Sequence, residues 1–156
     1  MKLTLFINGT SNDVYCDSNE TLLDVLRDRI GLKEVKAGCR GGECGSCTVI
    51  LNGKAVNSCL VLAAEADGAE IVTIKGLSKE ALSPLQTAFV EEGAIQCGFC
   101  TAGFVLTAAA YLRENPRPND EEIKRAVVGN LCRCTGYQSV VKAIRRASGG
   151  AGGETK

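Results

Sequence analysis

The sequence predicts an α+β protein in which a mixed half precedes a purely helical half. Alternating apolar residues and two Asn-Gly pairs are typical of strands and hairpins before residue 78. After that point the strand signals stop, and apolar residues recur at helical spacing. We therefore expect one α+β domain over 1–78, a helical bundle over 79–147, and a disordered, Gly-rich tail over 148–156.

Two hairpins and one further strand account for the sheet. Apolar residues alternate over 3–7, and Asn8-Gly9 predicts a tight turn into a second strand at 14–16. Asn52-Gly53 predicts another hairpin in the same way. Residues 70–77 are expected to form the last strand.

Five segments have helical spacing, and several carry end signals. They lie over 17–31, 83–93, 97–115, 119–129 and 136–147. Ser83 followed by Pro84 is a typical helix start, and Asn119 with Glu122 has the spacing of a capping box. Gly31 is expected to end the first of these helices.

Composition and charge exclude several classes of function. The chain has 156 residues, 45% of them hydrophobic, which suits one medium domain or two small ones. Its formal net charge of +0 does not favour nucleic-acid binding, which needs a basic excess. The N-terminus lacks a signal-peptide core, and no apolar run reaches the ~18 residues of a membrane span. We therefore expect a cytoplasmic protein with no membrane span.

Cysteine is unusually frequent, with nine residues and no histidine in the chain. Eight of the nine form two spaced groups, and Cys16 stands alone as an expected small buried residue. Disulfides are rare in the reducing cytoplasm, so ligation of a metal explains the groups better. The first group is Cys39, Cys44, Cys47 and Cys59, and the second is Cys97, Cys100, Cys132 and Cys134.

The first group has the spacing of a plant-type ferredoxin that binds a [2Fe–2S] cluster. Its first three cysteines are separated by four and then two residues, inside the segment "CRGGECGSC". Glycines allow the positive φ angles that a loop wrapped around a cluster needs. We expect this role for Gly38, Gly41, Gly42 and Gly45. A four-cysteine zinc site is the alternative, and the glycine-rich spacing argues against it.

The second group combines a C-x2-C pair with a C-x-C pair at helix ends. Four thiolates from two inter-helix loops suit a second [2Fe–2S] cluster at one end of a bundle. Spacing alone leaves zinc about as plausible here. The ferredoxin-type loop in the same chain favours iron and sulfur.

Three segments closely resemble one known family. "CRGGECGSCTV", "QCGFCTAGF" and "GNLCRCTGYQ" are similar to blocks of the iron–sulfur subunit of molybdenum hydroxylases, such as xanthine dehydrogenase and aldehyde oxidoreductase. The resemblance covers roughly residues 1–147. It implies a β-grasp ferredoxin-like domain followed by a four-helix bundle, with one [2Fe–2S] cluster in each.

The resemblance also implies roles for particular residues and partners. The two cysteine groups match the ligands of the two clusters, and Gln96 and Cys134 match residues at the pterin. The partners would be a large molybdopterin-binding subunit and a medium FAD-binding subunit. Ala102 and Phe104 depart from the family pattern, which usually has proline and often methionine there. Neither is a ligand.

The function expected from these residues is electron transfer. The chain has no acid–base or nucleophilic set of its own, so substrate chemistry would belong to the molybdopterin subunit. Arg40 and Arg133 lie next to ligand cysteines and would favour the reduced clusters, or simply be solvated or interface charges. A free-standing ferredoxin-like carrier and a zinc-stabilised interaction module are the alternatives. The sequence does not name the substrate, which could be a purine or another N-heterocycle, an aldehyde, carbon monoxide or an aromatic acyl-CoA. We favour a xanthine-dehydrogenase-like complex.

Overall fold

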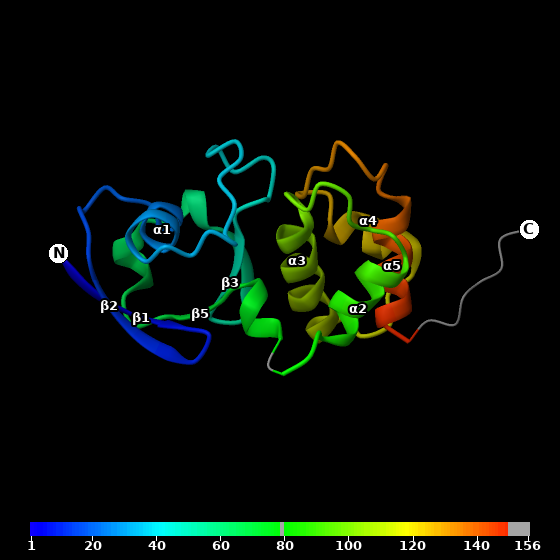
Figure 1. The fold of residues 1–156 in the computed structure, drawn as a ribbon, viewed down its shortest axis with the longest axis horizontal. Helices are drawn as coiled ribbons and strands as arrows, with labels where there is room; N and C mark the ends of the chain where they lie inside the picture. The colour runs from blue at the N-terminus through cyan, green and yellow to red at the C-terminus, as the bar shows by residue number, and fades with distance from the viewer. Residues whose placement is uncertain (79, 150–156) are drawn as a thin grey trace, which may run out of the picture.

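The computed structural model describes residues 1–78 and 80–149. A five-stranded mixed sheet fills the first half, in the order β2-β1-β5-β3-β4. Only the β1–β5 pair is parallel. Figure 1 shows the sheet on one side of the molecule and helices α2 to α5 on the other. The strands are β1 Lys2–Ile7, β2 Thr10–Tyr15, β3 Thr48–Leu51, β4 Lys54–Asn57 and β5 Glu70–Val72.

Both predicted hairpins are confirmed. Asn8 and Gly9 have φ angles of 51° and 82°, and Asn52 and Gly53 have 47° and 84°. Two consecutive positive φ angles define the turn whose twist matches that of the flanking strands. The last strand is shorter than predicted, because β5 ends at Val72 and residues Ile74–Leu77 form a 3-10 turn.

The first helix is shorter and less regular than the expected 17–31. It begins at Leu22, because the Thr21 side chain accepts from the Asp24 N–H in a capping box. Helix α1 covers Leu22–Asp24 and continues as a π-helix over Val25–Arg29. The end at Gly31 is as predicted, with φ 88° and a hydrogen bond from Leu32 N–H to the Leu26 carbonyl.

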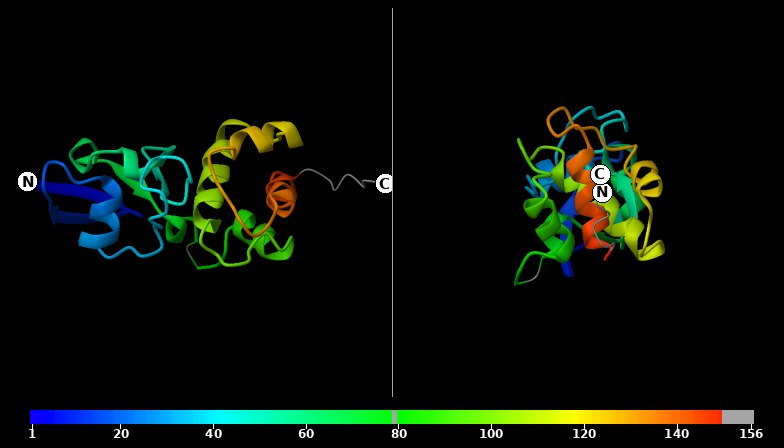
Figure 2. Two further views of the ribbon diagram at one scale, coloured as in Figure 1. Left: turned by 90° about the horizontal axis from the view of Figure 1, so that it is seen from above. Right: turned by 90° about the vertical axis from the view of Figure 1, so that its right-hand side faces the viewer.

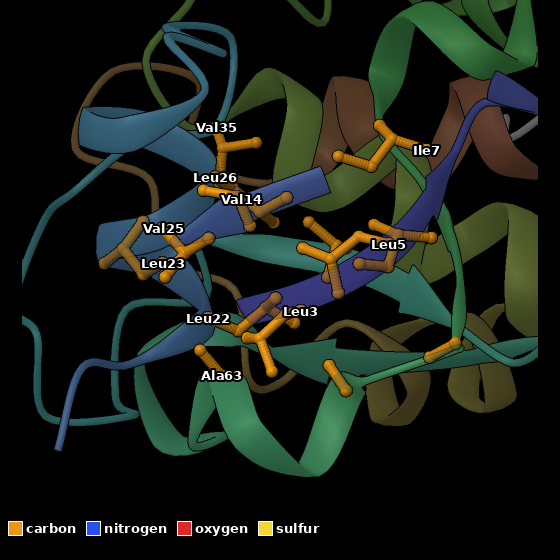
Figure 3. Close-up of a cluster of buried hydrophobic side chains, with 14 of the residues drawn as sticks. Leu3, Leu5, Ile7, Val14, Leu22, Leu23, Val25, Leu26, Val35 and Ala63 are labelled. Carbon is orange, nitrogen blue, oxygen red and sulfur yellow. The ribbon is translucent and has the colours of Figure 1, made fainter. Parts of the chain in front are cut away.

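The core of the first half lies between this helix and the sheet (Figure 3). Leu22, Leu23 and Leu26 point from the helix toward Leu3 and Leu5 of β1, and all five side chains are fully buried. Cys16 is buried in the same core, directly after β2, as the sequence predicted.

Four helices form the second half and share a separate apolar core. Their predicted starts at Ser83 and Asn119 are confirmed, since both side chains accept from the backbone N–H three residues on. The long helix begins at Thr101, so Cys97 precedes it and Cys100 is its N-cap. The bounds are α2 Pro84–Glu91, α3 Thr101–Glu114, α4 Asp120–Ala126 and α5 Gln138–Ala147.

Helix α3 joins the two halves. Figure 2 shows it standing between the sheet and the remaining helices. Its Phe104 packs in the helical core, whereas Leu106 and Ala110 pack against Ile50 of β3 in a small apolar cluster. Within the described part of the chain, no helix is both long and apolar enough to cross a membrane.

Candidate metal centres

The first cysteine loop, residues 38–47, leads into β3 and is shaped by both backbone angles and tight contacts. Gly42 and Gly45 have φ angles of 80° and 68°, as the sequence predicted. Gly38 and Gly41 do not have positive φ, and Arg40 has it instead, at 56°. At Gly38 the need is space, because a Cβ there would lie 2.7 Å from the Cys44 sulfur.

Backbone N–H groups converge on the exposed Cys39 thiol. Those of Gly41, Glu43 and Cys44 donate to its sulfur at 3.3–3.4 Å. These bonds stabilise the thiolate and lower the pKa of Cys39 to about 6. The Cys44 thiol lies beside it, so these two cysteines form one thiol pair.

Cys47 and Cys59 are the other two cysteines of this group. Both are buried in the same core, and the hydroxyl of Ser58, next to Cys59, donates to the Cys47 carbonyl at 2.7 Å. Burial, and then the neighbouring Cys47, raise the pKa of Cys59 to about 11. The segment that follows β4 brings Cys59 back to the loop, where it also lies near Cys39.

The cysteines of the second group differ in burial. Cys100 and Cys132 both pack against the helical core, and Cys134 is joined through its carbonyl to the side chain of Gln96, the neighbour of Cys97. Burial, and then Cys132, raise the pKa of Cys100 to about 12. Cys100 and Cys132 are half-buried, and Cys97 and Cys134 are exposed.

Hydrogen-bond donors around Cys132 stabilise its thiolate form. Its sulfur accepts from the N–H groups of Cys134 and Thr135, both at 3.4 Å, and from the Thr135 hydroxyl at 3.1 Å. Burial raises the pKa of Cys132, but these donors outweigh it and lower the pKa to about 7.

The arrangement fits a two-iron cluster better than a single ion. Among the residues described, no three His, Cys, Asp or Glu side chains are grouped closely enough to hold one metal ion. A tetrahedral four-cysteine zinc site needs four sulfurs around one centre. A [2Fe–2S] cluster instead takes four thiolates over two irons, so it does not need all four sulfurs around one centre.

Gln96 lies at the edge of the second group. Its side-chain N–H donates to the Cys134 carbonyl at 3.2 Å, which links the two ligand loops. The sequence placed both residues at one site, and the structure brings them together. Gln96, Cys97 and Cys134 are all exposed, so this edge is open.

The two arginines beside ligand cysteines differ in their surroundings. The Arg40 guanidinium pairs with Asp24 and lies 3.7 Å from Asp28. Its charge is therefore largely balanced by carboxylates. Arg133 is exposed and has no ion-pair partner among the described residues.

A direct link between the two cysteine groups was not predicted from the sequence. The Leu131 N–H donates to the Cys44 carbonyl at 2.9 Å, and the buried Asn130 side chain donates to the Gly45 carbonyl at 3.1 Å. Leu131 immediately precedes Cys132, so the two loops touch beside one cysteine of each group. The one sequence signal was Asn130, a polar residue between Gly129 and Leu131, two positions before Cys132.

Comparison with known proteins identifies both halves. Residues 5–76 match the "2Fe-2S iron-sulfur cluster binding domain" family, and residues 73–145 match the "[2Fe-2S] binding domain" family. The nicotine 6-hydroxylase small subunit of Paenarthrobacter nicotinovorans is 49% identical over 97% of this chain and 92% of its own length. The chain is an iron–sulfur subunit of the molybdenum hydroxylase family.

Other members of the family are similarly close. The nicotinate dehydrogenase small FeS subunit of Eubacterium barkeri is 49% identical over 93% of each chain. Quinoline 2-oxidoreductase of Pseudomonas putida 86 has a structure that superimposes with a TM-score of 0.91, at 44% identity over 95% of this chain and 92% of that one. Iron–sulfur subunits of Escherichia coli named for xanthine dehydrogenase and aldehyde oxidoreductase are 46% and 40% identical.

Membership of this family defines the role of the chain. It is an electron-transfer subunit with two [2Fe–2S] domains, and the family carries molybdopterin and FAD on partner subunits.

Phe104, which departs from the family pattern, is fully buried and packs edge-on against Tyr137, with ring centroids 6.1 Å apart.

Proposed function

We propose that the two cysteine groups are the ligand sets of the two clusters. The observation that carries this proposal is that backbone N–H groups converge on one cysteine sulfur in each group, Cys39 in the first and Cys132 in the second, with the other cysteines of the group nearby. One set is Cys39, Cys44, Cys47 and Cys59; the other is Cys97, Cys100, Cys132 and Cys134. The bound clusters would supply one-electron storage at two positions in the chain.

The chain's own residues would hold the clusters and stabilise their negative charge. Three N–H groups around the Cys39 sulfur act in this way for the first cluster. Those of Cys134 and Thr135 do so for the second. Ligation requires thiolates, so assembly would release protons chiefly from thiols with a raised pKa, such as Cys59 and Cys100. Cys39 and Cys132, whose pKa values are lowered, deprotonate most easily beforehand.

We further propose that residues 1–78 are a β-grasp domain and residues 79–147 a four-helix bundle. The separate apolar cores of the two halves support this division. The proposed disordered tail covers 148–156, and its residues 150–156 lie outside those the structure describes.

We infer that the second cluster faces the molybdopterin subunit, with Gln96 and Cys134 at the pterin. Both residues are exposed and hydrogen-bonded to each other, so they present one polar edge to a partner. The exposed Cys39 loop would then face a medium, FAD-binding subunit. Electrons would pass from molybdenum through the second and first clusters to FAD or another acceptor.

We propose an N-heterocycle as the substrate class of the complex. The names of similar subunits and structures refer to nicotine, nicotinate, quinoline and xanthine. This class includes the xanthine-dehydrogenase-like complex favoured from the sequence. Activity of the purified complex toward aldehydes alone would contradict it.

The alternative is a free-standing electron carrier. Such carriers often use a strong acidic field for docking, and the net charge of this chain is +0. Gel filtration of the natively purified protein is expected to show co-purifying subunits.

All nine cysteines are free of disulfides, which supports the proposed cytoplasmic location.

Metal analysis tests the ligand proposal directly. We expect about four irons and about four acid-labile sulfides per chain, because each ligand set would hold one [2Fe–2S] cluster. The visible spectrum should be red-brown, since zinc–thiolate sites are colourless. Stoichiometric zinc without sulfide would overturn the proposal.

A further inference from the structure

Each cysteine group contains one side-chain hydroxyl in contact with a ligand sulfur. The Ser46 oxygen lies 3.1 Å from the Cys44 sulfur, and the Thr135 oxygen lies 3.1 Å from the Cys132 sulfur. Both distances suit a hydrogen bond to sulfur. Neither hydroxyl was singled out by the sequence.

The Ser46 hydroxyl is confined to this contact. Its residue is only 3% exposed, so water is not an alternative partner. Gly38 closes the space on the other side, where a Cβ would lie 2.7 Å from both the Ser46 oxygen and the Cys44 sulfur. A ligated sulfur carries no hydrogen, so Ser46 is then the donor.

The Thr135 hydroxyl is oriented by its neighbours. Its oxygen accepts from the Tyr137 N–H at 3.4 Å, which leaves its hydrogen for the Cys132 sulfur. Tyr137 is held in turn, because its own hydroxyl accepts from the Cys132 N–H at 2.9 Å. The three residues form a closed ring of hydrogen bonds around one ligand sulfur.

We propose that Ser46 and Thr135 are positioning residues that separately raise the reduction potentials of the first and second clusters. This inference rests on the proposed ligand sets. Reduction adds one electron to a cluster and changes no bond to the cysteines, so negative charge on the sulfurs increases. A hydroxyl donor at a ligand sulfur stabilises the more negative state and so favours reduction.

The proposal predicts that the two potentials shift independently. Ser46→Ala removes the first hydroxyl, and Thr135→Val removes the second while keeping the side chain's shape. A redox titration of the purified complex, followed by electron paramagnetic resonance, reports each cluster separately. At a fixed potential, the ratio of reduced to oxidised cluster should fall about threefold to tenfold in the affected cluster alone. A tenfold fall corresponds to about 59 mV for one electron.

Conservative variants separate the hydroxyl's effect from packing. Ser46→Thr and Thr135→Ser keep a hydroxyl and should keep the parent potentials. Unchanged potentials in both hydroxyl-free variants would overturn the proposal, as would equal shifts of both clusters in either one. If neither Thr135→Val nor Thr135→Ala assembles the second cluster, the Thr135 hydroxyl is structural and the proposal fails for that cluster. If neither Ser46→Ala nor Ser46→Gly assembles the first cluster, the proposal fails for the first cluster for the same reason. If the parent complex shows no cluster signal, the ligand proposal itself has failed.

Discussion

At the scale of single residues, the two cysteine groups have different neighbours, so a substitution in one group should remove one cluster and leave the other. Cys47 is buried in the core of the first half, and Cys100 packs against the core of the second. Cys47→Ser should therefore remove only the first cluster, and Cys100→Ser only the second. Electron paramagnetic resonance of the reduced protein should show two signals in the parent and one in each variant.

Cys16 provides the matched control for this experiment. It is about as deeply buried as Cys47 and Cys59 but belongs to neither cysteine group. Cys16→Ala should keep both signals and cost about 1 kcal/mol in stability through lost packing. Loss of both signals from either ligand substitution would mean that the two groups are not independent.

The open edge at Gln96 predicts a different effect. Gln96→Ala should keep both clusters but slow their reduction by substrate about threefold to tenfold, because an amide contact to the partner's pterin is lost. The measurement is rapid mixing of the complex with the N-heterocycle that the parent oxidises, following cluster bleaching. Gln138→Ala, at a second exposed glutamine, should bleach at the parent rate. Parent-rate bleaching in Gln96→Ala would make Gln96 an ordinary surface amide.

At the scale of elements, helix α3 approaches the first cysteine loop so closely that its residue 103 has no room for a side chain. A Cβ at Gly103 would lie 2.2 Å from the Gly45 carbonyl oxygen, a backbone atom that cannot rotate away. Gly103→Ala gains about 1 kcal/mol in helix propensity but forces the elements apart at a cost of about 1–3 kcal/mol. We expect a net loss of stability.

Urea unfolding followed by circular dichroism measures this loss. Gly129→Ala is the matched control, because a Cβ there would meet nothing within 4 Å and its φ is not positive. Its free energy of unfolding should stay within about 0.5 kcal/mol of the parent. Equal stability of Gly103→Ala and Gly129→Ala would show that the first cysteine loop moves away from α3 without a loss of stability.

The elements also show what the sequence predicts well. Turns and caps were predicted because their signals are local, as at Asn8-Gly9 and Asn119. The first helix was predicted too long because the local capping box of Thr21 and Asp24, which starts the helix, was missed. The last strand was predicted too long because the Thr73 N–H donates to the Asn8 side chain, a contact that only the fold provides. The grouping of the cysteines into two ligand sets stays a prediction from their spacing. Spacing does not show which residues surround each sulfur, because Cys59 and Cys132 reach their sites only through the tertiary fold.

At the scale of the whole molecule, the two halves are joined at the cysteine loops as well as through helix α3. Residues 44 and 131 are far apart in sequence, so no local pattern predicts the hydrogen bond between them. Asn130 fixes this contact, because its buried side chain donates to the Gly45 carbonyl. The buried Asn130 amide therefore makes one of the contacts that set the distance between the two cysteine groups.

Asn130→Ala should loosen both loops together. The substitution removes one of three donors to the buried Gly45 carbonyl, which keeps the N–H and the hydroxyl of Thr48, so it should cost about 0.5–1.5 kcal/mol. Local opening should then expose the Leu131 N–H, so amide hydrogen exchange should quicken in peptides covering 44–48 and 127–135 alike. Mass spectrometry of the cluster-loaded protein measures both. Asn12→Ala, which removes an exposed side-chain bond to the Thr10 carbonyl, should leave both peptides unchanged. Faster exchange in only one of the two peptides would show that Asn130 does not couple the halves.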